Sequence, residues 1–280
     1  MKVTVLGCGG SGGVPMIGPV WGACDPKEPK NRRRRVSILV EEADTRILVD
    51  TSPDLRAQLL DAGINDLTAI VWTHHHADHM NGIDDLRPLN RFMKKPLDVY
   101  GSAETLAHIE RSFGYVFKPV PAGGPYYKPH LIPHAIQGPF QVGHFRVTPF
   151  EQDHGYGNKT LGFRIGNCAY STDVKALDER AFGMLGGLDL WIVDCLRDEP
   201  HPTHSHFAQT MDWIRRVQPK RAVLTHMSHE ADYATWKMRL PPHVEPGYDG
   251  LVVQLDEVRF VDRDPGGYYV QYMRDETPKP

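Results

Sequence analysis

Imidazole and carboxylate side chains crowd into one six-residue segment that directly follows an apolar run. The segment reads His74-His75-His76-Ala77-Asp78-His79, and the apolar run before it covers residues 68–73. Four possible metal ligands straight after a buried strand are costly to pack unless a cation binds them. Residues two apart in an extended segment point the same way, so His74 and His76 can reach one ion, while Asp78 and His79, past the bend, reach a second. His75 is out of phase and is expected to pack nearby.

Two metal ions need more ligands than this segment supplies, and three other short apolar runs each lead into a possible ligand. These are His154 in Gln152-Asp153-His154-Gly155, Asp173 in Tyr170-Ser171-Thr172-Asp173, and His226 in Leu224-Thr225-His226-Met227. Any one of them alone could equally be a structural histidine or a helix-capping aspartate. Loops at the ends of strands in a rigid sheet are common positions for functional groups, so the set predicts one shared metal centre.

Short strand candidates recur along the whole chain, and helical segments separate some of them. Strands are predicted at 2–6, 36–40, 46–49, 68–73, 97–100, 145–150, 162–165, 169–172, 188–193 and 222–225, and helices at 53–62, 103–113 and 207–217. This density of strands favours layered sheets. Residues 114–143 contain six prolines and predict a lid or a surface excursion. We expect one domain over 1–261 and a C-terminal tail or edge segment over 262–280.

Composition excludes several classes of protein. The 32 basic and 35 acidic residues give a formal charge of −3, so no cationic field would hold a long nucleic acid. No apolar run approaches the roughly 18 residues that a membrane-spanning helix needs, and the first residues lack the apolar stretch of a secretory signal. The four cysteines form no Cys-x-x-Cys pair and predict reduced thiols. A cytoplasmic protein is expected.

A glycine-rich segment suggests a nucleotide-binding loop but fails the test for one. Residues 7–12 fit the pattern Gly-x-Gly-x-x-Gly after a predicted strand. A dinucleotide fold needs a helix directly afterwards, whereas two prolines and two glycines fill residues 13–19. The segment therefore predicts a tight turn where the backbone passes close to another element.

With these motifs the chain resembles the metallo-β-lactamase superfamily of hydrolases, and more narrowly its PhnP-like phosphodiesterases, over about residues 3–254. The motifs that carry the resemblance are residues 7–15, Asp50, the segment from His74 to His79, Asp153-His154-Gly155, Ser171-Thr172-Asp173, Pro202-Thr203-His204 and Leu224-Thr225-His226-Met227-Ser228-His229. tRNase Z is a more distant relative. The resemblance implies an α/β (α+β) fold, a four-layer αββα sandwich of two mixed β-sheets flanked by helices.

The resemblance also implies roles for the site residues. By it, His74, His76 and His154 hold one divalent ion, Asp78, His79 and His226 hold the other, and Asp173 bridges both. His204 corresponds to the family's non-ligand histidine, which is proposed to contact phosphate and assist the leaving group; His206 competes for that role. Nitrogen and oxygen ligands suit zinc, manganese, iron and nickel, and Zn²⁺ or Mn²⁺ is expected.

One motif of the family is incomplete. PhnP-like proteins often carry a Cys-x-Cys-x-x-Cys segment that binds a structural zinc with a late histidine. Here Cys24 is the one cysteine of that stretch, with His229 as a possible partner. One thiolate and one imidazole cannot complete a tetrahedral site, so no structural Cys-zinc is expected. His229 is then either free to contact substrate or structural.

The basic run Arg32-Arg33-Arg34-Arg35 precedes a predicted strand. Such a run usually forms a solvated edge that discourages the addition of another strand. Alternatively, Arg34 and Arg35 could contact a second phosphate or a nucleotide base of the substrate.

The function predicted from these features is that of a dinuclear metal-dependent phosphodiesterase. It would hydrolyse a small, cyclic or nucleotide-like phosphodiester by a metal-bridging hydroxide, with His204 as phosphate contact and general acid and Asp78 as a second catalytic residue. The alternatives are a tRNase Z-like nuclease, another hydrolase of the superfamily acting on thioesters or lactams, and a non-catalytic metal-binding protein of cofactor biosynthesis. No membrane or long nucleic-acid partner is expected, and the resemblance allows a homodimer.

Overall fold

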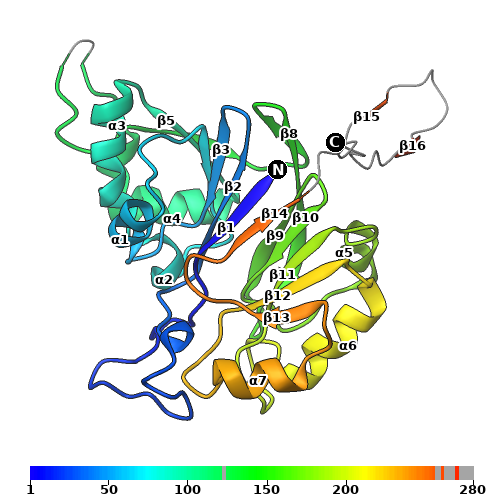
Figure 1. The fold of residues 1–280 in the computed structure, drawn as a ribbon. Coiled ribbons are helices and arrows are strands. Elements are labelled where there is room, and N and C mark those ends of the chain that lie inside the picture. The colour runs from blue at the N-terminus through cyan, green and yellow to red at the C-terminus, as the bar shows by residue number, and fades with distance from the viewer. Residues whose placement is uncertain (122–123, 256–259, 262–268, 271–280) are drawn as a thin grey trace, which may run out of the picture.

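A computed structural model describes residues 1–121, 124–255, 260–261 and 269–270 of the chain. Two seven-stranded β-sheets face each other, and helices cover the outer face of each sheet (Figure 1). This four-layer αββα sandwich confirms the predicted fold class. Among the described residues, no helix has the length and apolar character needed to cross a membrane.

The first sheet has the strand order β14-β1-β2-β3-β4-β5-β6. Its strands are β1 (Lys2–Gly7), β2 (Ser37–Glu42), β3 (Thr45–Val49), β4 (Ala69–Val71), β5 (Leu97–Gly101), β6 (Leu131–Ala135) and β14 (Val252–Gln254). The pairs from β14 to β3 are antiparallel, and the pairs from β3 to β6 are parallel. The carboxyl ends of β3 and β4 therefore lie side by side.

The second sheet has the strand order β13-β12-β11-β10-β9-β8-β7. Its strands are β7 (Phe140–Val142), β8 (Phe145–Asp153), β9 (Lys159–Ile165), β10 (Cys168–Ser171), β11 (Leu190–Asp194), β12 (Arg221–Thr225) and β13 (Val244–Pro246). Strands β10 to β13 are parallel, and β7 to β10 pair antiparallel. As a result β8, β10, β11 and β12 all end at the same edge of this sheet.

Side chains alternate between two apolar layers along the strands of the first sheet. Ile38 and Val40 of β2 pack between the two sheets, whereas Leu39 packs beneath the helices on the outer face. In β3, Ile47 faces the second sheet and Leu48 faces the helices. This period of two is that of a strand covered on both faces. All five side chains are fully buried, each worth about 1.5–3 kcal/mol of hydrophobic stabilisation.

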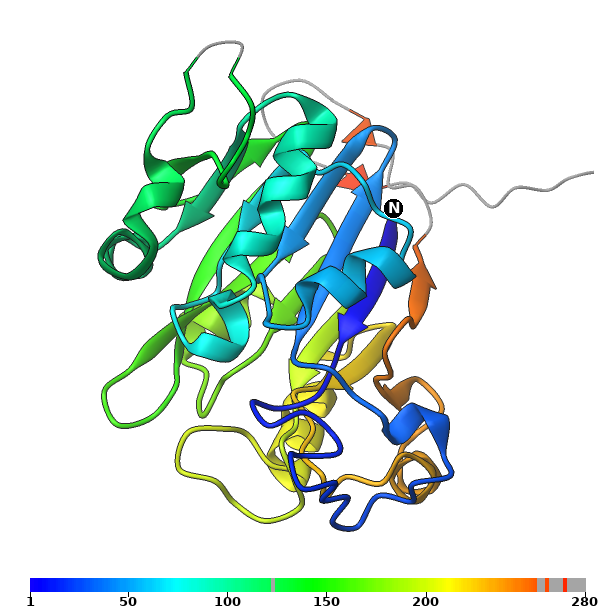
Figure 2. The same cartoon turned by 90° about the vertical axis from the view of Figure 1, so that its left-hand side faces the viewer.

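The helices divide between the two sheets in chain order. The first sheet is covered by α1 (Leu55–Asp61), α2 (Ala77–Met80), α3 (Arg87–Met93) and α4 (Ala103–Phe113), on the side seen in Figure 2. The second is covered by α5 (Glu179–Met184), α6 (Phe207–Val217) and α7 (Tyr233–Arg239). Short 3₁₀ helices cover Pro29–Asn31, Ile83–Leu86 and Gly114–Phe117, and β15 (Phe260–Val261) pairs with β16 (Tyr269–Val270).

The predicted elements agree with the structure best where the apolar pattern is long. The helices predicted at 103–113 and 207–217 have those bounds. Gly63, with φ of +67°, follows α1 and takes the left-handed conformation common after a helix end. The stretch 114–143 is more regular than its prolines suggest, because it supplies the edge strands β6 and β7. Pro133 is tolerated in β6 because an edge strand has backbone groups without a neighbour. The tail predicted at 262–280 lies outside the described residues apart from β16.

The glycine-rich segment turns without starting a helix, as predicted. A Cβ atom on Gly7 would lie 2.1 Å from the carbonyl oxygen of Arg35, so only glycine allows this approach. Beyond it, Gly10 donates its amide to the carbonyl of Met227 at 3.1 Å. The turn thus lies directly beside the residue that follows His226.

Candidate metal centre

The seven predicted ligands converge at the edge where the strands of both sheets end. The turn after β4 carries His74, and β8, β10 and β12 lead to His154, Asp173 and His226. Asp173 and His226 have φ of +53° and +55°, and Asp50, which follows β3, has φ of +64°. Non-glycine residues rarely adopt this left-handed conformation, which turns the chain sharply at the end of the strand.

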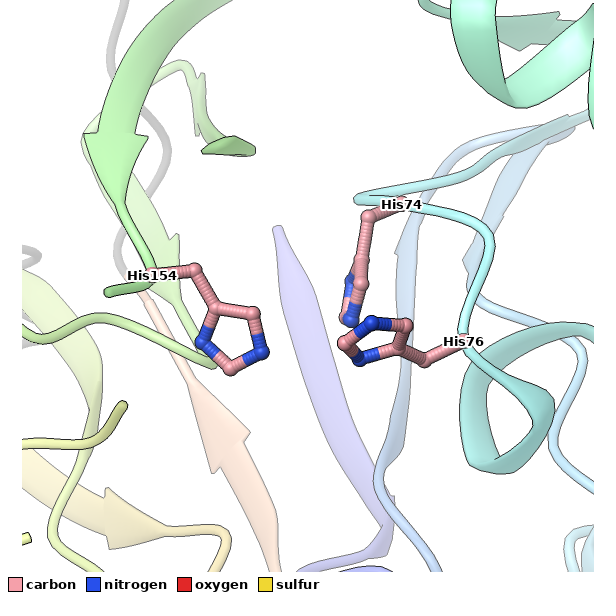
Figure 3. Close-up of side chains that lie close together, drawn as sticks. All are labelled: His74, His76 and His154. Carbon is pink, nitrogen blue, oxygen red and sulfur yellow. The ribbon is translucent and has the colours of Figure 1, made fainter. Parts of the chain in front are cut away.

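Three histidines form one half of the centre. His74, His76 and His154 each offer a ring nitrogen within 4.8 Å of the others. Figure 3 shows their rings facing a common space, with His154 approaching from the second sheet and the other two from the turn after β4. Burial is the largest cause that lowers the pKa of all three, and it holds the pKa of His74 well below its usual value. Neutral rings with a free lone pair are the form that binds a metal ion.

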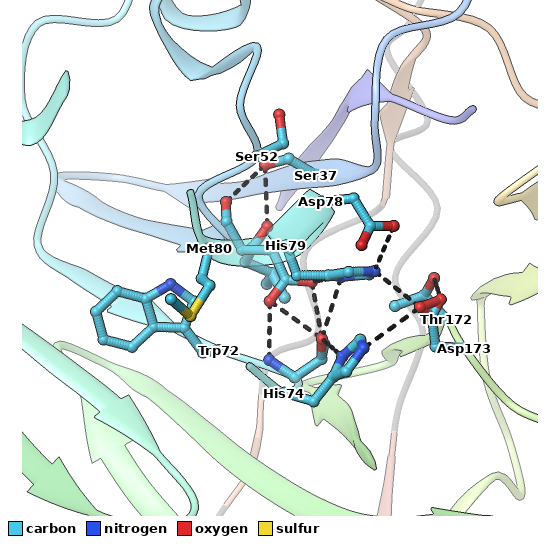
Figure 4. Close-up of polar contacts among 12 residues, drawn as sticks. Ser37, Ser52, Trp72, His74, Asp78, His79, Met80, Thr172 and Asp173 are labelled. Carbon is cyan, nitrogen blue, oxygen red and sulfur yellow. Dashed lines mark hydrogen bonds and ion pairs between the residues drawn. The ribbon is translucent and has the colours of Figure 1, made fainter. Parts of the chain in front are cut away.

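Two carboxylates and two histidines form the other half. Nε2 of His79 lies 2.8 Å from Asp173 Oδ1 and 3.4 Å from Asp78 Oδ2 (Figure 4). Nε2 of His226 lies 3.0 Å from Asp173 Oδ2 and 3.5 Å from Asp78 Oδ2.

The charges of this half are balanced by protons. Burial would lower the pKa of His226, but Asp173 and Asp78 outweigh it and raise that pKa to about 10. Burial likewise opposes the carboxylates around His79, which still raise its pKa well above the usual value. The pKa values of Asp78 and Asp173 are lowered by the same histidines although burial acts to raise them. A positive charge is therefore favoured where these two carboxylates and two histidines meet.

Asp173 is common to both halves. Its Oδ1 lies 3.6 Å from Nε2 of His74, and its Oδ2 faces His226. The Nε2 atoms of His74, His79 and His226 are buried, and despite these short approaches none makes a hydrogen bond of acceptable geometry. Buried ring nitrogens normally have a hydrogen-bond partner. Here the three ring nitrogens face the same carboxylate oxygens but make no hydrogen bond to them. This arrangement is the one expected of side chains that bind a divalent ion together.

Asp50 and Thr73 orient the ligands from behind. Asp50 Oδ2 lies 2.7 Å from Nδ1 of His79, and Asp50 Oδ1 accepts the backbone amide of Thr73 at 2.8 Å. The Thr73 hydroxyl lies 3.0 Å from Nδ1 of His74. Because Nδ1 of each ring is engaged, Nε2 is left to face the centre. Asp50 belongs to the quoted motifs, whereas Thr73 was not singled out in the sequence.

His154 is oriented by the loop between β11 and α6. Its Nδ1 donates to the carbonyl oxygen of Thr203 at 2.9 Å. A Cβ atom on Gly155 would lie 2.3 Å from the carbonyl oxygen of Pro202, so the turn after His154 packs tightly on this loop. The packing of this turn on the loop places the ring of His204 beside the rings of His154 and His226.

His204 is paired with a carboxylate that the sequence reasoning missed. Its Nδ1 lies 2.9 Å from Oδ2 of the fully buried Asp194, which also accepts the amide of Val174 at 3.0 Å. The ring of His204 stacks on that of His226 with centroids 4.5 Å apart. The competing His206 instead occupies the N-cap position of α6. Asp194 follows an apolar strand as the predicted ligands do, and that signal could have found it.

The remaining predicted substrate contacts, Arg34, Arg35 and His229, interact with other parts of the chain. Arg34 pairs with Asp61 at 2.7 Å and Arg35 with Asp54 at 3.0 Å, so the side-chain ion pairs of both arginines are directed towards α1. His229 packs on the loop before β2, where a Cβ atom on Gly22 would lie 2.3 Å from its ring.

A buried arginine, Arg33, lies beside Cys24, the one cysteine of the incomplete motif. The Arg33 side chain approaches Cys24 Sγ at 3.9 Å and donates to the carbonyl oxygen of Ala231 at 2.7 Å. It also donates to Oδ1 of Asn31 at 3.2 Å. The prediction of a solvated basic edge is therefore wrong for Arg33, which is 2% exposed and ties the loop before β2 to the segment after β12.

Comparison with known proteins gives the class of this fold and site. A family model described as the beta-lactamase superfamily domain matches residues 45–227, more than half of the chain. The chain therefore belongs to the β-lactamase superfamily and has the metallo-β-lactamase fold that the resemblance of its motifs implied.

Within that class the resemblance to PhnP-like proteins is confirmed. A crystal structure described as a new diphosphatase from the PhnP family is 32% identical, covers 90% of this chain and 96% of its own, and superposes with a TM-score of 0.81. The short form of human tRNase Z covers 92% of this chain and 100% of its own with a TM-score of 0.69, and at 19% identity it shares the fold.

Relatives found by sequence match this chain over part of their own length. An octanoyltransferase of Porphyromonas gingivalis is 36% identical over 271 residues, which make up 95% of this chain and 54% of that protein. A ribonuclease Z of Methanopyrus kandleri is 26% identical over 143 residues, or 49% of this chain and 46% of that protein. The chain spans about half the length of the curated relatives it matches.

Proposed function

We propose that this protein is a dinuclear metal-dependent hydrolase of phosphate esters, acting on a small phosphodiester. The observation that carries the proposal is the pair formed by His204 and Asp194, whose imidazole stacks beside the ligand candidate His226. A carboxylate-supported imidazole beside a metal centre suits a reaction in which a poor leaving group must be protonated. Phosphate esters of sugars and nucleosides have such leaving groups.

The ligand sets of the proposal follow the two halves of the centre. His74, His76 and His154 would hold one divalent ion, Asp78, His79 and His226 the other, and Asp173 would touch both. When bound, two such ions supply Lewis-acid activation of a water molecule and compensate the charge of a phosphoryl group. Zn²⁺ and Mn²⁺ both suit this nitrogen and oxygen donor set.

Two residues of the chain would move protons in the reaction. Nδ1 of His204 is engaged by Asp194, so Nε2 is the atom that donates a proton to the departing oxygen. The side chain of Asp78 is 14% exposed, against 2% for Asp173, and its second oxygen can accept the proton of the attacking water. Asp194 then stabilises the protonated form of His204 between turnovers.

A second candidate function is hydrolysis of an octanoyl thioester. It is supported by the 36% identity to the Porphyromonas gingivalis octanoyltransferase over nearly the whole of this chain. A thiolate leaves without prior protonation because its conjugate acid has a pKa of about 8.5. Hydrolysis of a thioester would therefore not need the proton that His204 and Asp194 can supply. The presence of this pair favours a phosphate ester, whose alkoxide leaving group needs a proton.

The test compares the two substrate classes on one preparation. Chelator-treated protein is reconstituted with Mn²⁺ or Zn²⁺ and assayed with bis(p-nitrophenyl) phosphate and with an octanoyl thioester of pantetheine. We expect metal-dependent turnover of the phosphodiester. Turnover of the thioester alone would replace the first proposal with the second, and turnover of neither, with both ions bound, would support a non-catalytic metal-binding protein.

A further inference from the structure

Two stretches of the chain carry basic side chains and no acidic ones. No aspartate or glutamate occurs over residues 86–97 or over residues 111–150, although acidic residues outnumber basic ones in the whole chain. The first stretch contains α3, and the second contains most of the excursion, the segment between α4 and β6. The two lie side by side (Figure 1), because the side chain of Asn90 donates to the carbonyl oxygen of His130 at 3.2 Å and accepts the amide of the same residue at 3.0 Å.

Basic side chains of α3, of the residues after it and of the excursion form a surface that we call the basic surface. Its members are Arg87, Arg91, Lys94, Lys95, Lys118 and Lys128. All are exposed except Lys128, which is partly buried, and none of them forms an ion pair with a described carboxylate. On the other helical layer, by contrast, Arg239 of α7 pairs with Asp198 at 2.6 Å and Arg216 of α6 pairs with Glu179. The charges of the basic surface are therefore not compensated within the chain.

The helix α3 places three of these charges in a row. Arg87, Arg91 and Lys94 are four and three residues apart, so they lie along one side of the helix, whereas Leu89 on the opposite side is buried. Like charges at this spacing repel one another. Because α3 has no acidic residue of its own, a bound polyanion would relieve the repulsion.

Aromatic side chains lie among the charges. Phe92 is 65% exposed and Tyr127 is 59% exposed. The guanidinium of Arg91 donates to the carbonyl oxygen of Tyr126 at 2.6 Å, and that of Arg87 donates to the carbonyl oxygen of Tyr127 at 3.5 Å. These bonds hold the excursion on α3, so exposed rings and cations share one surface.

A cavity of about 520 Å³ opens between α3 and the excursion. Its lining includes Arg91, Lys94, Tyr126 and His130, and the rings of the last two lie 6.2 Å apart. Sites for small organic ligands have volumes of about 300–1,000 Å³, so one nucleotide unit fits this space. The lining offers cations for a phosphate and aromatic groups for a base.

We propose that the basic surface binds single-stranded nucleic acid, with phosphates on its lysines and arginines and bases on its aromatic rings. Proteins that bind single strands combine a positively charged track with aromatic side chains on which bases stack. The formal charge of −3 predicts no attraction by the molecule as a whole, whereas phosphate contacts depend on local cations. This binding uses no residue of the metal centre and goes beyond the proposed function.

An anionic membrane matches the basic surface less well. A helix that lies on a membrane buries a continuous apolar face among the lipids. On the described part of this surface, Phe92 and Tyr127 are the large apolar or aromatic side chains that are more than half exposed. Two separate rings provide sites for stacking bases but no continuous apolar face.

The experiment measures binding by fluorescence anisotropy of labelled oligouridylate of about 12 nucleotides, a length within the range of known single-strand sites. The full chain is treated with chelator so that the strand stays intact. One variant removes three exposed lysines that lie outside the hydrogen bonds holding the excursion on α3: Lys94→Gln, Lys95→Gln and Lys118→Gln. The matched control removes three exposed arginines from the other helical layer: Arg180→Gln, Arg215→Gln and Arg216→Gln. A separate variant, Phe92→Ala, tests stacking without a change of charge, and the melting temperature of each variant shows that it is folded.

Contacts from all members of the basic surface predict that affinity falls about 20-fold when salt is doubled, and about fourfold in the variant without the three lysines. Loss of one stacked base in Phe92→Ala should weaken binding about fivefold or more. The control without the three arginines should match the parent protein.

Equal losses in the lysine variant and the arginine control would overturn the proposal, because binding would then follow total charge. Absence of binding to the oligouridylate would overturn it as well, and binding to phosphatidylserine vesicles in its place would assign the surface to a membrane. Binding of uridine monophosphate as tightly as the oligouridylate would reduce the surface to a site for one nucleotide. None of these outcomes depends on turnover of bis(p-nitrophenyl) phosphate, so the proposed function is tested separately.

Discussion

Replacing Asp194 with asparagine tests the acid directly. The carboxylate lies 2.9 Å from Nδ1 of His204, and the variant keeps an oxygen that can accept the amide of Val174, so the fold should be retained. A hydrogen bond to a charged group contributes about 1.5–3 kcal/mol. The protonated form of His204 should lose about this much, which is roughly a 10- to 100-fold fall in rate. The fall should be large for an alkoxide leaving group and small for p-nitrophenolate, which leaves without a proton.

The assay is a series of phosphodiesters of graded leaving-group basicity, measured with metal content determined in parallel. Asp189→Asn is the matched control, since Asp189 is a buried carboxylate just before the other end of β11 and pairs with Lys220 at 2.7 Å. A uniform fall across all leaving groups would refute the role assigned to the pair. Loss of metal in Asp194→Asn would instead make Asp194 part of the ligand set.

Three further predictions follow from the contacts of single residues. Asp173→Ala should lower bound metal, measured by elemental analysis, together with activity, because its two oxygens face both halves of the centre; full metal content would contradict the bridging role. In metal-free protein the pKa of His226 is raised from 6.5 to about 10, so its protonated form contributes stability that is complete below pH 6.5 and is lost as pH rises through 10. The melting temperature of chelator-treated protein should therefore fall as pH rises over this range. Metal affinity should rise over the same range, because metal binding displaces the proton. A melting temperature that does not change with pH would contradict the electrostatic account. Arg33→Met should lower the free energy of unfolding in urea by about 2–4 kcal/mol, because the carbonyl of Ala231 and other buried acceptors lose their donor, whereas Arg32→Met on the exposed neighbour should change it by less than about 0.5 kcal/mol.

Local patterns in the sequence were sufficient to place the ligand candidates. His74, His154, Asp173 and His226 each follow an apolar run of strand length, and parallel strands bring such positions to one edge whatever their order in the sheet. The structure brings all seven candidates together for this reason. Asp194 satisfies the same rule but was missed, because its partner His204 lies ten residues on, across an irregular loop whose course no periodicity indicates.

Other features depend on contacts distant in sequence. Arg33 is buried and its neighbour Arg32 exposed, a difference that arises because Arg33 meets carbonyls of the segment after β12, nearly two hundred residues away. Charge alone predicted an exposed run there. In the same way, Pro133 marks a break by local rules but lies in an edge strand, where its missing amide has no partner to lose.

The left-handed residues at the strand ends connect the fold to the chemistry. Asp50, Asp173 and His226 each hold a conformation that costs about 1–2 kcal/mol relative to an ordinary one. All three are fully or nearly fully buried, so the surrounding sheets, and not the local chain, maintain these angles. The positive φ angle turns the backbone at the end of the strand and sets the direction of the side chain there. A residue with a right-handed conformation at the same position would point its side chain in a different direction. The packing of the two sheets therefore fixes these three turns, and with them the positions at which the candidate ligands converge.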